Sequence, residues 1–341
     1  MIRIAINGFG RIGRSILRAL YERNLQDQLQ VVAINELADL ESVSYMLRYD
    51  STHGRFSGSV ETKENGLIVN GDAIQVFHES EVSSLPWQSL GIDLVLECTG
   101  VITNRDHAEL HLVQGAKRVL ISHPAESSVD ATVIQGFNQH TLRADNKIIS
   151  NGSCSTNCLI PVLQLLNTEF GIKRGMTTTI HSAMNDQPVI DAYHSDLRRT
   201  RAAVQSIIPV ETGLAIGIAR LMPELANKFE SLHIRVPTLN VSVLDVTLQL
   251  EENVTVEQVN SVLKQATESQ LEGILAFTQE PHASVDFNHD PHSGVVDATQ
   301  TRVSDGSLVK LMIWFDNEWG FANRMIDTAL QLKNLNPVEQ D

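Results

Sequence analysis

The sequence predicts an α/β protein in which a unit built on a parallel sheet precedes an α+β unit whose sheet is mainly antiparallel. Through the first 150 residues, short apolar runs alternate with helical patterns, as in parallel sheets whose strands are joined by helices. A glycine-rich turn separates the first apolar run from the first helical pattern. After about residue 153, apolar and polar residues alternate, which is typical of an antiparallel sheet covered on one face.

The length and composition indicate a globular protein of about two domains. The chain has 341 residues and a formal net charge of −15. This acidic balance argues against non-specific nucleic-acid binding, and an anionic substrate would need a local cationic pocket. No apolar stretch approaches the roughly 18 residues of a membrane span. Three cysteines without a secretion signal indicate reduced thiols, so we expect a soluble, cytoplasmic protein.

The first half predicts a repeated strand–helix pattern. Residues 2–6 form an apolar strand, a helical pattern follows the glycine turn, and residues 31–34 form a second buried strand. Asn70-Gly71 lies between two apolar runs and predicts a hairpin over residues 67–77. Further strands are expected at 93–98, 118–121 and 147–150, and a helix at 106–114.

The second half predicts a one-sided sheet with a helix packed on it. Residues 241–250 alternate between apolar and polar side chains. Thr255 and Gln258 then form the pattern of a capping box, which marks the start of a helix. A further strand is expected at 309–315 and a last helix from Phe321 to Leu330, followed by a polar tail from about Asn336.

The glycine turn is the strongest functional motif, since Gly8, Gly10 and Gly13 fit the G-x-G-x-x-G pattern. It follows a strand and opens a helix, whose N–H groups and dipole would bind a pyrophosphate. Glu36, at the end of the next strand, would bind the adenosine ribose and repel a 2′-phosphate. The alternative is a structural turn beside a surface glutamate. The combination favours a Rossmann-type unit that binds NAD through Asn7, Gly8, Gly10, Arg11, Ile12, Gly13 and Glu36.

Cys154 lies where a polar run meets the start of an apolar helical pattern. A helix start favours the thiolate form, but a nucleophilic cysteine also needs a basic partner. Cys158, one helical turn further on, and Cys98, at the end of a strand, are interpreted as packing residues. The pattern by itself leaves both a structural and a catalytic role open for Cys154.

His181 is the histidine that its position favours as a base, because it ends the strand-like run 176–180. The sequence pattern alone does not pair it with a cysteine. His289 and His292 have a His-x-x-His spacing without a third ligand, so we interpret them as loop residues and predict no metal site.

Arg198, Arg199 and Arg201 form a basic cluster. One interpretation is a solvated helix face, and the other is that one arginine clamps an anion. Because the chain is acidic and no carboxylate interrupts this run, we favour the anion clamp.

Taken together, these motifs resemble the glyceraldehyde-3-phosphate dehydrogenase family over nearly the whole chain. The resemblance implies an NAD-binding domain at 1–153, a catalytic domain at 154–317 and a C-terminal helix at 318–341 that returns to the NAD-binding domain. It also implies a homotetramer that acts on a small phosphorylated aldehyde. The matching segments are residues 6–14, 49–54, 153–158, 179–182, 235–238 and 314–318.

The resemblance also implies roles for individual residues. Cys154 would be the nucleophile, His181 its basic partner, and Asn317 the ligand of the nicotinamide carboxamide. Arg199, Thr212 and Arg235 match positions that bind the anions of the substrate and of inorganic phosphate. The other expected substrate-binding residues are Ser153, Ser155 and Gly213.

Three positions depart from the glycolytic members of this family. Met184 replaces a threonine that contacts the substrate's phosphate, and a thioether cannot donate that hydrogen bond. Ser155 replaces a threonine but keeps a hydroxyl, and Ile216 stands where lysine is frequent. Together with the segments 97–100, 122–124, 181–184 and 285–292, these departures resemble a branch that oxidises D-erythrose 4-phosphate to 4-phosphoerythronate, on the route to pyridoxal 5′-phosphate. In that branch, water would release the acid. The alternatives are a phosphorylating, glycolytic enzyme and a non-catalytic NAD-sensing protein.

Overall fold

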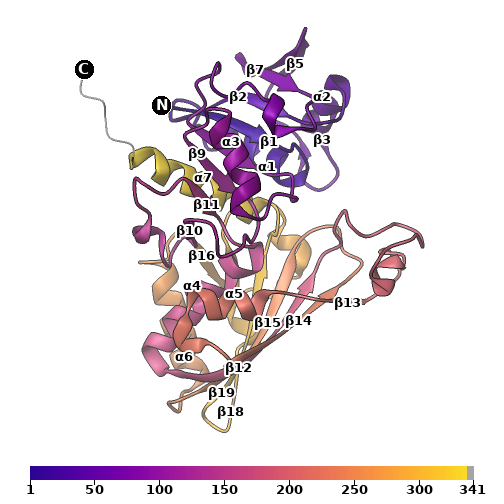
Figure 1. The fold of residues 1–341 in the computed structure, drawn as a ribbon. Coiled ribbons are helices and arrows are strands. Elements are labelled where there is room, and N and C mark those ends of the chain that lie inside the picture. The colour runs from indigo at the N-terminus through magenta and orange to yellow at the C-terminus, as the bar shows by residue number, and fades with distance from the viewer. Residues whose placement is uncertain (336–341) are drawn as a thin grey trace. The chain divides into compact units, whose positions relative to one another are not determined.

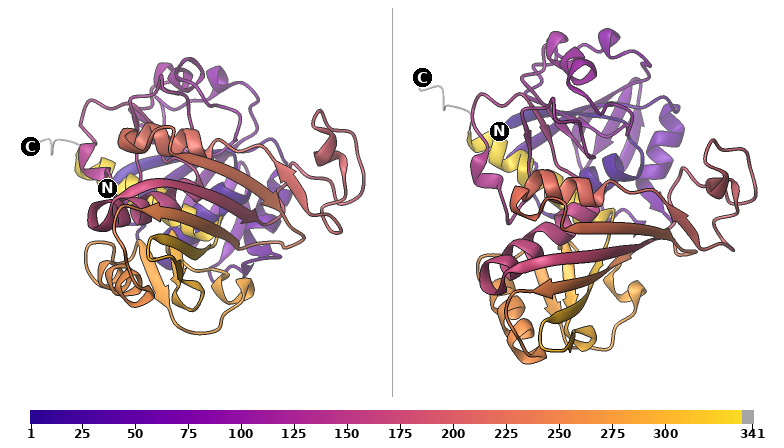
Figure 2. Two further views of the ribbon diagram at one scale, coloured as in Figure 1. Left: turned by 90° about the horizontal axis from the view of Figure 1, so that it is seen from below. Right: turned by 60° about the horizontal axis from the view of Figure 1, so that its bottom comes forward.

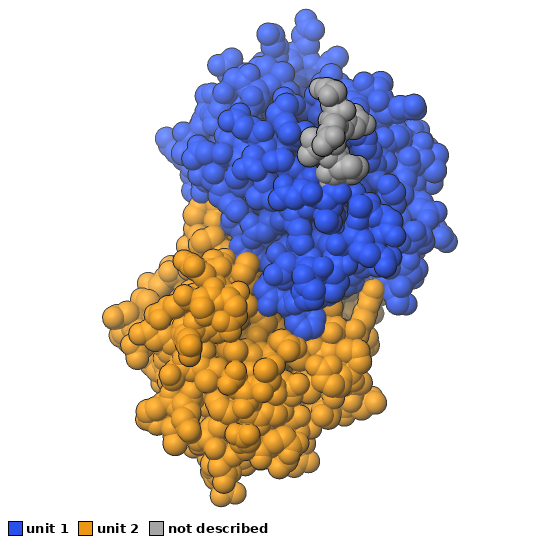
Figure 3. Space-filling model, turned by 90° about the vertical axis from the view of Figure 1, so that its left-hand side faces the viewer, with its two compact units in different colours: residues 1–153, 322–341 blue, residues 154–321 orange. Residues whose placement is uncertain are grey.

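The chain divides into two units at the junction of Ser153 and Cys154. The computed structural model describes residues 1–335, so the predicted polar tail from about Asn336 lies outside the described residues. Unit 1 comprises residues 1–153 together with the chain from Ala322 onward, and unit 2 comprises residues 154–321 (Figure 3). Each unit has its own sheet and is described separately.

Unit 1 is built on a largely parallel sheet. Its strands are β1 (Ile2–Asn7), β2 (Leu29–Asn35), β5 (Val60–Lys63), β6 (Gly66–Val69), β7 (Asp72–Phe77), β8 (Leu94–Glu97), β9 (Arg118–Ile121), β10 (Ala131–Thr132) and β11 (Ile148–Ser150). Within the described residues their order is β10-β11-β9-β8-β1-β2-β7-β6-β5. Every pair from β10 to β7 is parallel, and β6 and β5 extend the sheet antiparallel. The predicted parallel sheet is therefore confirmed.

The strand order reverses beside β1. The chain passes from β1 to β2 on one side and later returns to β8 on the other. Such a switch point leaves a crevice at the carboxyl ends of the strands, where open α/β sheets bind ligands. The glycine turn follows β1 at this point.

The predicted hairpin over residues 67–77 is confirmed. Strands β6 and β7 pair antiparallel across Asn70 and Gly71, which have φ angles of 50° and 95°. Positive φ at both central positions is the backbone of a type I′ turn, whose twist matches that of the strands. The Asn-Gly dipeptide therefore determines this connection locally.

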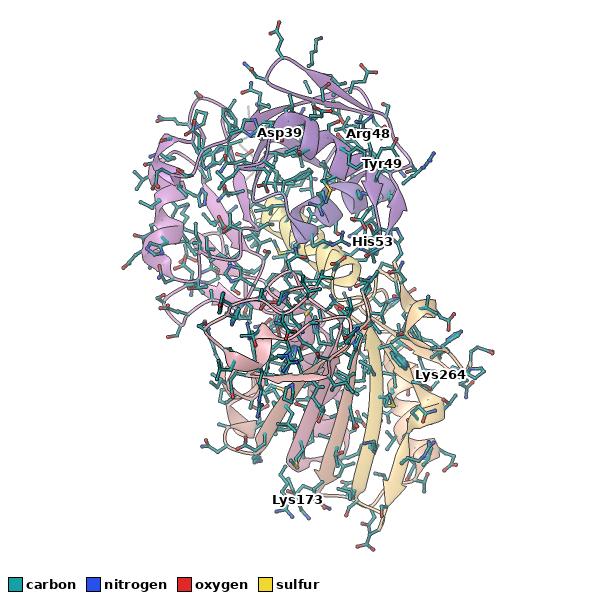
Figure 4. All side chains as sticks on the ribbon, turned by 90° about the vertical axis from the view of Figure 1, so that its right-hand side faces the viewer. Asp39, Arg48, Tyr49, His53, Lys173 and Lys264 are labelled. Atoms are coloured by element: carbon teal, nitrogen blue, oxygen red, sulfur yellow. The ribbon has the colours of Figure 1, made fainter. Side chains whose placement is uncertain are left out.

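Helices and short turns connect the strands of unit 1. The α-helices are α1 (Arg11–Glu22), α2 (Leu40–Arg48) and α3 (Arg105–Val113), with a small β3–β4 ribbon (Tyr49–Asp50, Gly54–Arg55) and two 3₁₀ turns, η1 (Val82–Ser84) and η2 (Gln139–Thr141). Asp39 caps α2 by accepting a hydrogen bond from Ser42 N at 2.9 Å. At the other end of α2, the Arg48 guanidinium lies 5.7 Å from the ring centre of Tyr49 (Figure 4).

The final helix, α7 (Trp319–Asn334), contributes most of its length to unit 1 (Figure 1). Thr328 Oγ1 donates to Asn151 Oδ1 at 2.8 Å, and Gln135 Nε2 donates to Thr328 Oγ1 at 3.0 Å. Arg118 Nη1 also donates to the Leu332 carbonyl at 3.3 Å. These buried bonds hold α7 against β9 and the segment after β11.

Unit 2 is built on a mainly antiparallel sheet. Its strands are β12 (Ile172–His181), β13 (Ile208–Val210), β14 (Phe229–Arg235), β15 (Ser242–Leu250), β16 (Leu275–Thr278), β17 (Gly294–Asp297), β18 (Arg302–Ser304) and β19 (Leu308–Phe315). Their order is β13-β14-β12-β15-β19-β17-β16, with β18 paired to β19. Two neighbouring pairs, β12–β14 and β16–β17, are parallel. The predicted, mainly antiparallel sheet is confirmed, and the sequence did not predict the two parallel pairs.

Helix α4 (Cys154–Phe170) packs on one face of this sheet, against β15 and β19. Leu244, Val246, Leu248 and Leu250 are fully buried on that face, as their alternation predicts. The other helices are α5 (Leu214–Leu221) and α6 (Val256–Thr267), with short 3₁₀ turns at η3 (Leu197–Thr200), η4 (Pro223–Leu225), η5 (Ser284–Phe287) and η6 (Ala298–Gln300).

Two further features of unit 2 are the start of α6 and the segment between β12 and β13. The predicted capping box is confirmed, since Thr255 N donates to Gln258 Oε1 at 2.8 Å and Gln258 N donates to Thr255 Oγ1 at 3.3 Å. The segment between β12 and β13 extends away from the sheet (Figure 2).

No helix within residues 1–335 is both long enough and apolar enough to cross a membrane.

Candidate active site

The backbone of the glycine turn in unit 1 leaves no room for a side chain at Gly8 or at Gly13. Gly8 has a φ of +89°, and a Cβ atom there would lie 2.6 Å from Thr99 N. A Cβ atom on Gly13 would lie 2.3 Å from the Gly8 carbonyl oxygen. Gly10, which has no side chain, precedes the first residue of α1. The close turn thus leaves the start of α1 open to an anionic group, as a dinucleotide pyrophosphate requires.

Glu36 lies where the sequence predicts it, directly after β2. Its Oε2 atom accepts a hydrogen bond of 2.8 Å from Phe9 N, which ties the carboxylate to the glycine turn. Its other oxygen, Oε1, accepts only a long hydrogen bond of 3.4 Å from Ala38 N, so it can also accept one from a ribose hydroxyl. These residues fit a dinucleotide whose ribose carries no 2′-phosphate.

A buried carboxylate, Glu97, holds the strand ends beneath the turn. It accepts hydrogen bonds from Asn7 Nδ2 at 2.7 Å, from Thr99 N at 2.9 Å and from His111 Nε2 at 3.1 Å. Trp87 Nε1 donates to His111 Nδ1 at 2.9 Å, so the proton of this imidazole lies on Nε2. Burial alone would raise the pKa of Glu97, but the bonds from His111, Thr99 and Asn7 hold it below its ordinary value.

The side chain of Asn7 is therefore occupied within the fold. Its Nδ2 atom donates to Glu97, and its Oδ1 atom accepts a hydrogen bond of 2.8 Å from Asn35. Arg11, at the start of α1, forms an ion pair with Asp50. Ile12 is partly exposed in the same helical turn.

In unit 2, the structure brings Cys154 and His181 together. Cys154 is the first residue of α4 and His181 the last residue of β12. The Cys154 Sγ atom lies 3.8 Å from His181 Nε2. The pairing that the sequence pattern could not establish is thus present in the fold.

The hydrogen bond on the far side of the His181 ring defines its tautomer. Nδ1 lies 2.8 Å from the Ser182 carbonyl oxygen. A carbonyl only accepts hydrogen bonds, so Nδ1 carries the proton and donates it. In the neutral ring, Nε2 then presents its lone pair to the Cys154 thiol. This is the geometry of a general base beside its nucleophile.

The surroundings keep the Cys154 thiol and the His181 imidazole uncharged. Burial raises the pKa of the Cys154 thiol to about 11. Burial lowers the pKa of His181 to about 4; the Ser182 carbonyl opposes this shift, and the positive charge of Arg235 adds to it. At neutral pH the pair therefore consists of a thiol and a neutral imidazole.

Asn317 lies beside the same strand ends, two residues after β19. Its Oδ1 atom accepts hydrogen bonds from Ser182 Oγ at 3.0 Å and from Ser242 Oγ at 2.9 Å. Both bonds use the carbonyl side of the amide, so the NH₂ group is turned away from them. This orientation suits a donor to a carboxamide oxygen.

Two of the predicted anion-binding residues lie together beside His181. Arg235 ends β14 and is the register partner of His181 across the β12–β14 pair. Arg235 Nη2 donates to Asp186 Oδ2 at 3.2 Å, and Arg199 Nη1 donates to the same oxygen at 2.7 Å. Of the basic cluster, Arg199 therefore faces the site, whereas Arg201 pairs with Asp191 on the exposed loop.

The remaining predicted residues lie on two helix starts. Ser155 is buried in the first turn of α4, and Ser153 directly precedes that helix. Thr212 and Gly213 precede α5, which packs against α4 and β14. Thr212 Oγ1 accepts a hydrogen bond of 3.2 Å from Leu214 N.

Two residues of this site were not identified from the sequence. The ring of His233 stacks on that of His181, with centroids 4.9 Å apart and planes 23° apart. His233 precedes Arg235 by two positions on β14, a spacing that places both on one face of the sheet. Asp186, which joins the two arginines, lies in the loop after β12. The strand alternation could have indicated His233, but no local pattern indicates Asp186.

Other candidate groups have structural surroundings. Burial raises the pKa of the Cys98 and Cys158 thiols, as expected of packing residues. His292 Nδ1 lies 2.8 Å from Asp290 Oδ1, and the ring of His289 stacks on Trp319. Within residues 1–335, no group of three or more His, Cys, Asp or Glu side chains is placed to hold a metal ion.

A dinucleotide-binding unit followed by a unit with a paired cysteine and histidine defines the class of nicotinamide-dependent aldehyde oxidoreductases. Residues 2–105 match the model of the NAD-binding domain of glyceraldehyde 3-phosphate dehydrogenase, and residues 153–317 match the model of its C-terminal domain. The chain belongs to the glyceraldehyde-3-phosphate dehydrogenase family. It is accordingly an NAD-binding oxidoreductase that acts on a phosphorylated sugar aldehyde.

We expect Glu36 to determine the choice between NAD and NADP. In Glu36→Gln, an amide oxygen still accepts the Phe9 N–H bond, but the charge that repels a 2′-phosphate is lost. The ratio of kcat/KM for NADP to that for NAD should rise about tenfold, from a charged hydrogen-bond contribution of roughly 1.5 kcal/mol. Glu41→Gln, in the first turn of α2, is the matched control. An unchanged ratio in Glu36→Gln would contradict this role.

We also expect the Cys154 thiol to become reactive only as the pH rises. Because its pKa is raised to about 11, the rate of iodoacetamide alkylation should increase about tenfold per pH unit between pH 7 and 9. The measurement is the alkylation rate of the cofactor-free protein, with Cys154→Ser reporting the background from Cys98 and Cys158. A rate that is already constant from pH 6 to 9 would instead indicate a thiolate–imidazolium pair.

Proposed function

We propose that the protein oxidises D-erythrose 4-phosphate to 4-phosphoerythronate with NAD, and that this step belongs to the route to pyridoxal 5′-phosphate. Cys154 acts as the nucleophile and His181 as the general base. Arg199, Arg235 and Thr212 bind the anionic groups of the substrate, and Gly213, Ser153 and Ser155 are further substrate-binding residues. The observation that carries the substrate assignment is Met184.

Met184 lies in the loop after β12, three residues beyond His181, and is exposed. In the glycolytic pattern this position is a threonine that contacts the substrate's phosphate, and a thioether cannot donate the equivalent hydrogen bond. A four-carbon substrate is one carbon longer than a three-carbon one, so its phosphate would be bound elsewhere. The loss of this donor is consistent with the longer substrate.

In the oxidation, His181 Nε2 takes the thiol proton as the Cys154 sulfur adds to the aldehyde carbon. The proton passes to the former aldehyde oxygen, which gives a thiohemiacetal. His181 then removes this hydroxyl proton as the carbon gives up its hydride, and the product on Cys154 is a thioester. NAD, when bound, supplies the acceptor for that hydride. The Cys154 N–H and the His181 ring stabilise the oxyanion, and the Asn317 NH₂ group binds the carboxamide of the nicotinamide.

In the release step, the oxygen of a water molecule adds to the thioester carbonyl. His181 first gives the proton it took in the oxidation to solvent and then accepts one proton from this water. The carbon–sulfur bond breaks, and this second proton returns to the Cys154 sulfur. The product is a carboxylic acid. In the phosphorylating alternative, an oxygen of inorganic phosphate takes the place of water and the product is an acyl phosphate.

The oligomeric state is a further proposal, which rests on exposed apolar side chains. Several apolar side chains of the segment between β12 and β13 are exposed to solvent. Exposed apolar patches mark contacts between protein chains. We propose that they are covered in a homotetramer, and a single-chain mass in light scattering would refute this. The same proposal places the protein in the cytoplasm, where thiols stay reduced. The side chains are Val189, Ile190, Tyr193, Leu197, Val204 and Ile207.

The test is NADH formation with erythrose 4-phosphate and with glyceraldehyde 3-phosphate, each with and without inorganic phosphate. We expect a higher kcat/KM for the four-carbon sugar and turnover without phosphate. Preference for the three-carbon sugar with strict phosphate dependence would identify a phosphorylating enzyme instead. Cys154→Ala is the control for the covalent mechanism and should lose NADH formation with either sugar. A protein inactive with both sugars would favour an NAD-sensing role.

A further inference from the structure

The two arginines expected to bind the substrate's anions already hold an anion that belongs to the protein. Both donate to the carboxylate of Asp186: Arg235 through Nη1 and Nη2 to its two oxygens, and Arg199 through Nη1 to Oδ2. Two parallel N–H bonds from one guanidinium are the arrangement that arginine also forms with a phosphate group. Asp186 therefore occupies the Nη pair of Arg235 and one Nη donor of Arg199, whereas the buried Nε atoms of both arginines have no hydrogen-bond partner within residues 1–335.

The three side chains differ in how freely they can move. The Arg235 side chain is 6% exposed and lies at the end of a strand, so its guanidinium is held in place. The Asp186 side chain is 39% exposed and lies in a loop. Arg199 has a second carboxylate, Asp196, 3.5 Å from its Nε atom. Of these groups, the Asp186 carboxylate is the most exposed, so it can leave for solvent while Arg235 stays.

We propose that Asp186 is a resident counter-anion of the phosphate site, which an incoming phosphate must displace from Arg235 and Arg199. This inference rests on the proposed function, in which these arginines bind the substrate's phosphate. Asp186 lowers the affinity of the site for every anion, but anions differ in how well they compete with it. It is thus a residue that determines which phosphates the site accepts.

A phosphate that is part of the substrate competes more effectively than inorganic phosphate. Once the aldehyde carbon is bonded to Cys154, the substrate's own phosphate is tethered near the arginines at a high effective concentration. Inorganic phosphate has no tether and must displace the carboxylate from bulk solution. The Asp186 carboxylate therefore selects against inorganic phosphate, in agreement with water as the proposed acyl acceptor.

The charged groups around Asp186 keep it an anion, so it competes with phosphate for the same arginines. Burial by itself would raise its pKa, but Arg235 and then Arg199 hold the pKa of Asp186 below its ordinary value. The carboxylate is thus charged at neutral pH and repels a phosphate dianion that approaches the same guanidinium groups. Replacing it with a neutral amide keeps a hydrogen-bond acceptor for Arg235 but removes the competing charge.

The test is calorimetric titration of the full-length protein with inorganic phosphate. We expect Asp186→Asn to bind phosphate up to about fivefold more tightly, the change expected when a partly exposed ion pair is removed. Asp186→Glu keeps the charge and should bind like the original protein. Asp245→Asn is the matched control, since it removes a carboxylate paired with Lys310 at 2.7 Å elsewhere in unit 2. Thermal melts verify that each variant is folded.

The outcomes separate this inference from the proposed function. If Arg235→Gln weakens phosphate binding but Asp186→Asn leaves it unchanged or weaker, the arginines form the anion site and Asp186 only orients them, which overturns the inference. If phosphate binding is insensitive to both Arg235→Gln and Asp186→Asn, the anion site lies elsewhere, and the inference and the assignment of these arginines both fail. A tighter Asp186→Asn whose binding is lost on adding Arg235→Gln establishes both.

Discussion

The pairing of β12 with two neighbours of opposite direction is the constraint on which the candidate active site depends. Its parallel pair with β14 brings the carboxyl ends of both strands together and makes His181 and Arg235 register partners. Its antiparallel pair with β15 brings Ser242, where β15 begins, to the same edge, and Phe315 of β19 pairs with Ser242 there. A slip of one residue would turn His181 to the other face of the sheet.

At this edge, burial and Arg235 lower the pKa of His181, Asp186 raises it, and a neutral His181 suits base catalysis. Burial and the positive charge of Arg235 disfavour a protonated His181, so the imidazole remains a proton acceptor at neutral pH. The same guanidinium would be a costly buried charge without a partner, and Asp186 supplies one. One arginine thus acts on both the proposed base and the proposed anion site, and Asp186 lies within reach of both electrostatically.

In unit 1, the glycine turn is shaped mainly by its backbone, and the Glu36 carboxylate is bonded to it. Glu97 draws Asn7, Thr99 and His111 to one buried carboxylate, and all of its donors in this network are neutral. The network fixes the ends of β1 and β8 where Gly8 passes within contact of Thr99. The resulting turn leaves the start of α1 accessible, which is the property that dinucleotide-binding units share.

The sequence by itself determined the features that depend on residues close together in the chain. The glycine turn, the Asn70-Gly71 hairpin, the Thr255–Gln258 cap and the alternation of β15 follow from local backbone preferences and side-chain periodicity. Residue roles such as those of Cys154 and His181 came from a resemblance, because pattern alone could not pair them. Only the tertiary structure decided which distant residues meet. The Cys154–His181 contact, the stacked His233 and the Asp186–arginine cluster depend on strand pairings and loop paths. Such contacts join segments far apart in sequence, and a local pattern carries no information about their distance.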